Sequence, residues 1–292
     1  LKDKLGNRSN ASAEIEYDSA VGWLVGEEGR GVRTIIEMVN LTRLDCTIAG
    51  ATAMRTALTH AAHYVAHRAA FGAQLIDQPL MRNVVADLAV EAEAATIVAF
   101  HLAAATDRAE AGDESAALLR RVVLAASKYW VCKRTAPHVG EALECLGGNG
   151  YIEDSGMPRL YREAPLISIW EGSGNVAALD TLRAMATKPE SVDVLLDELA
   201  LAAGGDSRLD AHVSRLKESL GDIDSIQHRA RRIAEDICKA VQGALLVRHG
   251  HPVVADAFCA SRLDNDRGDA YGTLPTGLAL DPIIGRAVPK IG

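Results

Sequence analysis

The acidic residue Glu171 is the residue of this sequence best placed to do chemistry. It lies between bulky apolar neighbours and a Gly-Ser-Gly turn, in Ile169-Trp170-Glu171-Gly172-Ser173-Gly174-Asn175. We expect the apolar run at 166–170 to be extended and to carry the carboxylate into a dry place, where loss of water raises a carboxyl pKa. Such a pKa suits a base that takes and holds a proton near neutrality. The alternative, favoured by the local residues alone, is a helix start, where acids and small polar residues are preferred.

Two upstream motifs could bind a phosphate or a flat ring. Arg68 carries a planar fork of donors that suits a pyrophosphate, Phe71 could pack on an adenine or flavin edge, and Gly72 would turn the chain. The alternative is a helix end, with a basic residue that favours the helix dipole and a glycine stop. In the second motif, the backbone N–H groups of 147–150 (Gly-Gly-Asn-Gly) could cradle a phosphate or an adenine edge. An ordinary helix-to-loop transition is the alternative there.

Four motifs, in their order and spacing, resemble the carboxy-terminal helical domain of the flavin-dependent acyl-CoA dehydrogenases. They are His67 to Gly72, Leu146 to Tyr151, Arg162-Glu163-Ala164-Pro165 and Trp170-Glu171-Gly172-Ser173. The run Gln78-Pro79-Leu80-Met81-Arg82 and the additional tail look more like the AidB-like (alkylation-response) branch. The resemblance covers residues 1–185 closely and residues 186–292 more loosely.

The resemblance implies FAD-dependent α,β-dehydrogenation of an acyl-CoA thioester. Glu171 would remove an α proton while a β hydride passes to the flavin and hydrogen-bond donors hold the enolate oxygen. Some family members carry the base just before the residue that matches Arg43. That position is Thr42 here, which leaves Glu171 as the matching carboxylate. Arg43 matches an arginine of the active-site wall; an ion pair with Asp45 or another surface acid is its structural alternative.

The resemblance also implies how FAD is held. Arg68 and the glycine loop would reach the FAD of a neighbouring subunit, so we expect a homo-oligomer, a dimer or tetramer, that shares its flavin sites. Ser173 and Asn175 would combine helix capping with flavin contact. Acyl-CoA is the implied substrate, and an electron-transfer protein is a compatible acceptor. The implied cofactor-binding residues are Arg68, Phe71, Gln78, Glu144, Gly147, Gly148, Gly172, Ser173 and Asn175.

Two positions depart from the family pattern. Most members carry a glutamine three residues before the glycine loop, where this chain has Glu144. An ionised glutamate cannot donate a hydrogen bond, so the donor to the adenine is lost at this position. The usual flavin-contacting glutamine falls on Pro79, one residue after Gln78. Arg162 and Glu163 fit structural ion pairs better than chemistry.

The elements that position these residues are predicted to be mainly α-helical. Apolar residues recur every three or four positions from about residue 29 to 65, from Met81 to Leu102, from the N-cap Asp113 to Leu143 with Pro137 as a kink, and from Asn175 to Met185. Four such helices joined by short loops predict an up-and-down bundle, like the C-terminal domain of the acyl-CoA dehydrogenases. Residues 13–17 alternate like a half-buried strand, and residues 20–25 are a second short strand candidate. The resemblance assigns both to the edge of a middle β-domain.

A small helical extension follows the bundle. We expect two short helices around Gly204-Gly205, a longer one at 225–247, another from Pro252 to near Leu263, and irregular chain from Asp264 on. The predicted boundaries are 1–26 for the end of the β-domain, 27–187 for the flavin and acyl-CoA bundle, and 188–292 for the extension.

Composition limits the compartment and the partners. The 292 residues can bury a sizeable core. Five scattered cysteines without a Cys-x-x-Cys pair indicate reduced, mostly buried thiols in a cytoplasmic protein, without disulfides or a zinc site. No apolar run approaches the roughly 18 residues of a membrane span, and no signal peptide is present, so we expect no membrane partner. The chain opens at Leu1 without a methionine, which suggests a fragment or processed product.

The tail carries one basic cluster, residues 228–232, and this opens an alternative function. The AidB-like branch is associated with DNA binding through its tail, so the alternative is a flavin-containing, DNA-associated alkylation-stress protein. However, residues 188–292 contain 13 Lys and Arg against 16 Asp and Glu, a net charge of −3. This balance offers few phosphate contacts, and we favour a solvated helix face. His60 and His63, or His63 and His67, share a helix face, but neither pair has a third ligand, so no metal site is predicted.

Overall fold

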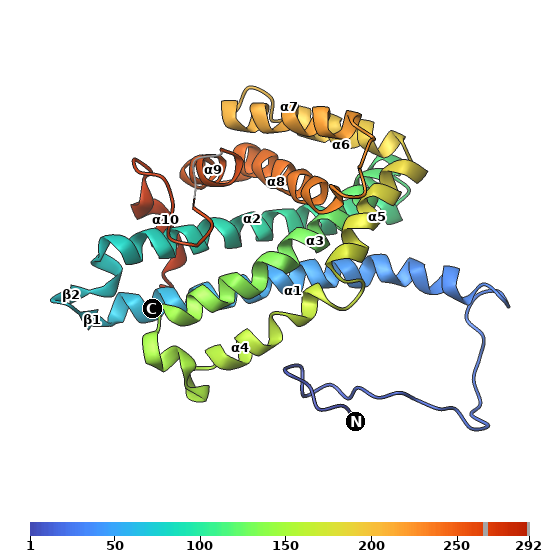
Figure 1. The fold of residues 1–292 in the computed structure, drawn as a ribbon, viewed down its shortest axis with the longest axis horizontal. Helices are drawn as coiled ribbons and strands as arrows, with labels where there is room; N and C mark the ends of the chain where they lie inside the picture. Colours follow the sequence, from blue (N-terminus) through green and yellow to red (C-terminus); the bar gives the residue numbers. More distant parts are fainter. Residues whose placement is uncertain (265–267, 291–292) are drawn as a thin grey trace.

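The computed structural model describes residues 1–264 and 268–290, and its regular structure is almost entirely helical. Three long helices form the centre: α1 (Gly31–His67), α2 (Pro79–Glu110) and α3 (Glu114–Glu144) pack against one another. Figure 1 shows them lying side by side along the long axis of the molecule. The predicted mainly α fold is confirmed.

The helix ends follow the local chemistry of the sequence. The predicted N-cap of α3 is confirmed, because the side chain of Asp113 accepts a hydrogen bond from the Ala116 amide at 3.0 Å. Pro79 opens α2 at a position where its missing N–H costs no hydrogen bond. Pro137 lies inside α3, which continues as one helix past it to Glu144.

The fourth predicted helix, α5 (Gly174–Thr187), packs on α3 and on a helix of the extension rather than on α1 and α2. That extension helix, α8 (Ala230–His249), also covers α2 and α3. The bundle and the extension therefore share one apolar core, in which residues from α1 such as Met54 lie in the same cluster as α8 residues such as Ile237.

The rest of the extension adds α6 (Glu190–Ala200), α7 (Ser207–Gly221), α9 (Pro252–Phe258) and α10 (Leu280–Ala287). A π-helical turn, Cys259–Leu263, continues α9 to the predicted end. The predicted irregular chain after Asp264 was wrong for α10, where Ile283, Ile284 and Ala287 form a buried face against α2. Residues 265–267 and 291–292 of that stretch lie outside the described residues.

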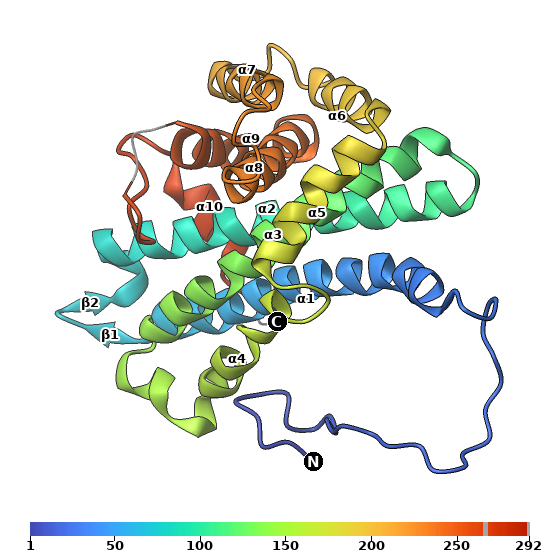
Figure 2. The ribbon, with the colours of Figure 1, turned by 45° about the vertical axis from the view of Figure 1, so that its right-hand side comes forward.

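The predicted strands at 13–17 and 20–25 were wrong, because residues 1–30 form no strand. Their apolar side chains are exposed, and Trp23 for example is 87% accessible. A strand needs a neighbour that accepts its ladder hydrogen bonds, and the described chain offers none here. Figures 1 and 2 show this segment looping away from the helices. Its main anchor is Asn7, whose amide donates to both carboxylate oxygens of Glu163 at 2.9 and 2.8 Å.

A buried ion-pair cluster joins the extension to the bundle. Arg262, at the end of the π-helical turn, donates to Glu91 of α2 at 3.1 Å and also pairs with Asp87. Arg134 of α3 donates to the same Glu91 oxygen at 3.1 Å. Burial alone would raise the pKa of Glu91, but the two guanidinium groups hold it well below its usual value. The cluster is fully paired in charge, as burial of ions requires.

The expectation that no apolar run approaches the length of a membrane span was wrong for α2. One 18-residue window of α2 is apolar enough to cross a membrane by length and composition, and 61% of that window is buried inside the protein. Its contacts with α1 and α3 account for this hydropathy, since a helix buried on most sides is apolar all round. The five cysteines are free and buried, as predicted.

Candidate active site

Glu171 lies on a tight turn between α4 (Met157–Glu163) and α5. The predicted extended run before it was wrong, because 166–168 form a short 3₁₀ turn in which the amides of Ile169 and Trp170 both donate to the Leu166 carbonyl, at 2.8 and 3.1 Å. The predicted dry setting is only partly realised. Ile167 is buried, but Ile169 is 61% and Trp170 41% exposed, and Glu171 itself is half-buried.

The backbone of this turn is held in an uncommon conformation. Glu171 has φ +56°, and Gly172 follows with φ +101°. A non-glycine residue at positive φ costs free energy and persists only where its surroundings impose it. A side chain at Gly172 would also place its Cβ 2.9 Å from Val176. Both the positive φ and the lack of space therefore require glycine here.

Two cationic side chains, from α3 and α1, hold this turn through hydrogen bonds to its backbone carbonyls. The ammonium of Lys128, on α3, donates to the backbone carbonyl of Trp170 at 2.8 Å and to that of Gly172. Arg43 Nε, on α1, donates to the carbonyl of Glu171 at 3.1 Å. Three consecutive carbonyls are thus bound to two cations. The Glu171 carboxylate has no hydrogen-bond or ion-pair partner within residues 1–264 and 268–290, and so stays available for an outside group.

Arg43 is itself positioned by a half-buried carboxylate. Asp180 of α5 accepts from Arg43 at 2.6 Å and from Arg121 of α3 at 2.9 and 2.8 Å. Burial would raise the pKa of Asp180, yet the hydrogen bonds and charges of Arg121 and Arg43 lower it overall, so the carboxylate stays ionised. Arg43 does form an ion pair, as the structural alternative expected, but its partner is not Asp45. Asp180 on α5 provides the carboxylate instead.

Sequence reasoning missed Lys128. A signal was present, because Lys128 is three residues after Ala125 and four before Cys132, on the apolar face of the predicted helix. A lysine on a core face needs buried acceptors, and the two turn carbonyls supply them. Burial lowers the pKa of Lys128, and the positive charge of Arg43 acts in the same direction, while the charge of Glu171 opposes it.

The predicted FAD-binding residues around Arg68 form a separate group at the far end of α1. Two short strands, β1 (Ala69–Ala70) and β2 (Ala73–Gln74), make a hairpin whose tip is Phe71 and Gly72. Both tip residues have positive φ, +53° and +83°, as a two-residue hairpin turn requires. Phe71 is 95% exposed, an unusual position for an aromatic ring in so constrained a turn.

The polar side chains beside this hairpin differ in whether they are free to bind a ligand. Arg68 caps α1 through its backbone, and its exposed side chain has no partner in the described part of the chain. The side-chain amide of Gln78 points back towards the Ala70 carbonyl, at 3.5 Å, and braces the hairpin. Arg68 and Phe71 therefore present free contact groups, whereas Gln78 is partly engaged.

The glycine loop lies next to the same end of α1. The Asn149 side chain donates to the Tyr64 hydroxyl at 3.0 Å. A Cβ at Gly147 or Gly148 would meet nothing within 4 Å, so their backbone faces open space. Gly150 differs, because a Cβ there would lie 2.1 Å from the Leu143 carbonyl oxygen. Glu144, the last residue of α3, is exposed beside this loop.

The two groups of predicted residues are too far apart to touch one small molecule within a single chain. Arg68 follows Arg43 by 25 residues on α1, about 38 Å along the helix axis. Figure 1 shows the hairpin and the Glu171 turn, just before α5, at well-separated positions along α1. The structure brings together Arg43, Glu171 and Gly172 in one place, and Arg68, Phe71, Gln78, Gly147 and Gly148 in another.

The residues that follow Glu171 are placed differently from the prediction. Ser173 is the N-cap of α5, but its side chain makes no capping hydrogen bond. Asn175 lies inside the first turn, where its side-chain oxygen accepts from Arg231 Nε at 2.8 Å. The predicted capping role was therefore wrong for both side chains. The exposed Ser173 hydroxyl is left available.

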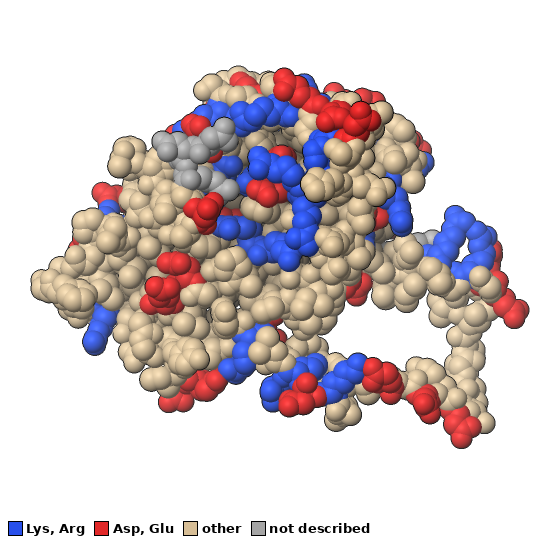
Figure 3. Space-filling model, in the orientation of Figure 1, with Lys and Arg blue, Asp and Glu red and all other residues tan. Residues whose placement is uncertain are grey.

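The remaining polar motifs are structural. Arg162 pairs with Glu153 at 2.6 and 3.0 Å, so the expected structural role is confirmed with a different partner. In the basic cluster, Arg229 donates to Ser219 at 3.0 and 2.9 Å, and Arg232 pairs with Asp236 at 2.8 Å. Figure 3 shows lysines and arginines gathering over α8 around a few acidic side chains.

Comparisons with known proteins identify related sequences. The sequence profile of the family described as acyl-CoA dehydrogenase, C-terminal domain, matches residues 29–186. The putative acyl-CoA dehydrogenase AidB of Escherichia coli (strain K12) is 42% identical over 268 residues, 92% of this chain and 49% of the relative. Acyl-CoA dehydrogenase family member 11 of Caenorhabditis elegans is 31% identical over 90% of this chain and 46% of the relative.

A solved structure extends the likeness to the fold. The crystal structure of Caenorhabditis elegans ACDH-11 in complex with C11-CoA superimposes with a TM-score of 0.82 at 30% identity, covering 89% of this chain and 49% of that one. The match includes most of the extension as well as the bundle. The chain spans about half the length of the relatives it matches.

Proposed function

The chain belongs to the acyl-CoA dehydrogenase family, and from this premise we propose that it carries the base and half of the flavin contacts of an FAD-dependent acyl-CoA dehydrogenase. The observation that supports the proposal most is the Glu171 turn. Its backbone is fixed by Lys128 and Arg43, while its carboxylate has no partner in the described residues. A base needs a fixed position and a free carboxylate, and this turn provides both.

In the proposed reaction Glu171 takes the proton from the carbon next to the thioester carbonyl of an acyl-CoA. When bound, FAD supplies the acceptor for the hydride that leaves the β carbon. The C11-CoA ligand of the ACDH-11 crystal structure supports an acyl-CoA as the substrate class. The hydrogen bonds from Lys128 and Arg43 keep the Glu171 carboxylate next to the bound substrate while the proton moves.

The groups at the far end of α1 fit a role in holding FAD. Arg68 would bind the pyrophosphate, the exposed Phe71 ring would pack on a flat edge, and the open backbone of Gly147 and Gly148 would donate to the nucleotide. We propose Glu144, Gln78, Gly172, Ser173 and Asn175 as weaker contacts. Because about 38 Å separates Arg68 from Arg43 along α1, the two groups serve different flavins, and a neighbouring subunit completes each site.

The test uses protein extended to the length of its relatives and purified with FAD. We expect a flavin spectrum that survives desalting and is bleached by at least one acyl-CoA. Glu171→Gln should keep the flavin and slow its bleaching by about 10²–10⁴-fold, because the base is absent. Glu218→Gln, an exposed change on α7, is the control. A protein that retains no FAD, or that is not bleached by any acyl-CoA, would refute the proposal.

A mixing experiment tests the shared site. Arg68→Gln and Glu171→Gln variants, each inactive alone, are mixed under conditions that exchange subunits. If each site combines Arg68 of one subunit with Glu171 of another, activity should return to about a quarter of wild type, since half the dimers are mixed and one of their two sites is intact. A mixture that stays inactive after verified subunit exchange would place both residues in one subunit's site.

The DNA-associated alternative has weaker support. The arginines of the 228–232 cluster already bind groups within the protein: Arg229 binds Ser219, Arg231 binds Asn175 and Arg232 binds Asp236. Salt-sensitive binding to duplex DNA that is weakened by Arg231→Ala with Arg232→Ala would favour this alternative. Absence of binding at low salt would remove it.

A further inference from the structure

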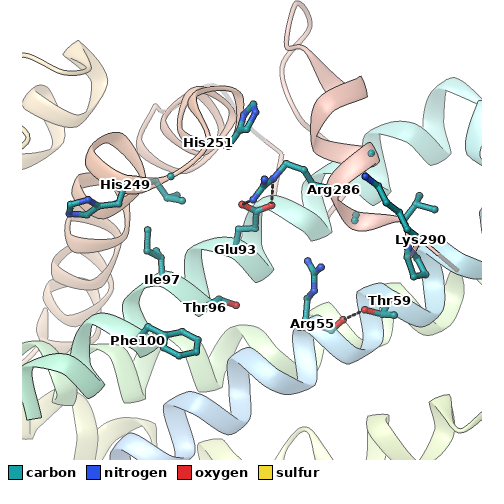
Figure 4. Close-up of a pocket in the computed structure, with 16 residues that line it drawn as sticks. Arg55, Thr59, Glu93, Thr96, Ile97, Phe100, His249, His251, Arg286 and Lys290 are labelled. Carbon is teal, nitrogen blue, oxygen red and sulfur yellow. Dashed lines mark hydrogen bonds and ion pairs between the residues drawn. The ribbon is translucent and has the colours of Figure 1, made fainter. Parts of the chain in front are cut away.

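A second cleft lies on another side of the bundle, between α1, α2, the end of α8 and α10. Its volume is about 970 Å³, comparable to small-molecule sites. Figure 4 shows Arg55 pointing from α1 into this cleft, Lys290 at one side and Phe100 at the other end. We call it the α2–α10 cleft. Arg55 follows Arg43 by 12 residues on α1, about 18 Å further along, so the cleft is separate from the Glu171 turn.

The charges that line the α2–α10 cleft are unbalanced. Its one acidic lining residue is Glu93, and both of its carboxylate oxygens accept from Arg286 at 3.0 Å. Arg55 and Lys290 have no acidic partner within residues 1–264 and 268–290. Two exposed cations that lack a counter-ion among the described residues therefore face one cleft, on a chain whose formal charge is −8. Such an arrangement attracts an anion into the cleft.

The opposite end of the cleft is apolar. Phe100 is 73% exposed there, and Ile97 lies one turn before it on α2. The hydroxyl groups of Thr59 and Thr96 already donate to carbonyls of their own helices, at 2.9 and 2.7 Å, so they are poor donors to a ligand. Recognition of a polar head would therefore fall to the two cations.

We propose that the α2–α10 cleft binds an amphiphilic anion, with a carboxylate or phosphate head on Arg55 and Lys290 and an apolar tail along Ile97 and Phe100. A guanidinium binds either head through two parallel hydrogen bonds, and an ammonium adds a third donor group. A tail of several methylenes would cover the exposed phenyl ring. This site does not depend on the proposed dehydrogenase function, because none of its residues contacts the Glu171 turn or the hairpin.

The test is a calorimetric titration of the purified chain at low salt with octanoate, octyl phosphate, acetate, inorganic phosphate and 1-octanol. We expect octanoate and octyl phosphate to bind, and the tighter of the two identifies the head. Each buried methylene should add about fourfold in affinity over acetate or phosphate. Octanol should bind at least about tenfold more weakly than octanoate, because it cannot pair with the cations.

Variants locate the binding. Arg55→Gln with Lys290→Gln should weaken octanoate by about tenfold or more, and Phe100→Ala should reduce the advantage of octanoate over acetate. Arg33→Gln, an exposed arginine on the same helix α1, is the matched control. All of these side chains are exposed, so circular dichroism and thermal unfolding should match wild type. Unchanged octanoate affinity in the double variant, equal binding of octanol, or no binding at all would overturn the proposal and leave the dehydrogenase proposal untouched.

Discussion

Arg43 Nε donates a hydrogen bond to the backbone carbonyl of Glu171 across 128 positions of sequence, at 3.1 Å. The bond ties the middle of α1 to the turn before α5. It acts on the backbone and not on the carboxylate, so it fixes the position of the side chain while leaving its charge free. Lys128 completes the arrangement from α3 by binding the carbonyls on either side.

Lys128→Met tests this positioning role. The substitution removes the donor to two carbonyls and should let the strained turn relax, so that Glu171 moves away from the substrate. We expect kcat for flavin reduction to fall by about 100-fold, because a displacement of about 1 Å costs that much, with KM changed far less. FAD should be retained. Lys217→Met, an exposed lysine on α7, is the control, and an unchanged kcat for Lys128→Met would exclude the positioning role.

Glu144→Gln tests the position before the glycine loop where this chain has a glutamate and most family members have a glutamine. A glutamine at this exposed position regains an N–H donor that the ionised glutamate lacks. We expect FAD to bind up to about tenfold more tightly, the value of one added hydrogen bond. Equilibrium dialysis against FAD measures the change, with Glu218→Gln as the control. Weaker or unchanged FAD binding would mean that Glu144 does not face the nucleotide.

Arg262→Met tests the buried ion-pair cluster. The variant leaves Asp87 without its main cationic partner and Glu91 with Arg134 alone. An uncompensated buried charge should reduce the free energy of unfolding by about 3–5 kcal/mol. Arg286→Met breaks the exposed pair with Glu93 and should cost less than about 1 kcal/mol. Urea unfolding measures the free energy of unfolding of both variants. Equal losses would contradict the prediction that the buried cluster contributes more to stability than the pair with Glu93.

His138 predicts a pH dependence of stability. Burial lowers the pKa of this histidine from 6.5 to about 4, and the charge of Arg134 acts in the same direction. One ring nitrogen lies 3.0 Å from the Leu88 carbonyl. The other, Nδ1, has no hydrogen-bond partner in the described part of the chain, so a proton bound to Nδ1 would have no acceptor. The unfolded chain binds that proton below pH 6.5 and the folded chain does not until about pH 4. Stability should therefore fall by about 3 kcal/mol over this window.

The measurement for His138 is urea unfolding at pH 7, 5.5 and 4, in wild type and in His138→Gln. A glutamine can still donate to the Leu88 carbonyl but does not titrate. The variant should lose less stability than wild type as the pH falls, and contributions from other titrating groups cancel in the difference. Parallel pH profiles for the two proteins would contradict the assignment.

The sequence by itself determined the helices and singled out Glu171 as the candidate base. Apolar periodicity and the caps at Asp113 and Pro79 are local properties, so α1, α2 and α3 could be predicted from neighbouring residues alone. The Phe71-Gly72 and Gly147-Gly148 motifs were readable for the same reason. The ordered motifs pointed to Glu171 as the base, because that resemblance depends on residue order and not on distance in space.

Tertiary structure decided what holds those residues in place. Lys128 and Arg43 act on the turn from 42 and 128 positions away in sequence, and Asp180 holds Arg43 from 137 positions away. No local pattern encodes such pairs. The extended run at 166–170 and the strands at 13–17 and 20–25 were predicted from the local pattern of apolar residues, yet a strand forms only where a neighbour completes its hydrogen bonds. Likewise, the unpaired charges of the α2–α10 cleft emerge only when α10 folds back beside α2. Long-range contacts therefore set the geometry and the electrostatics of both sites.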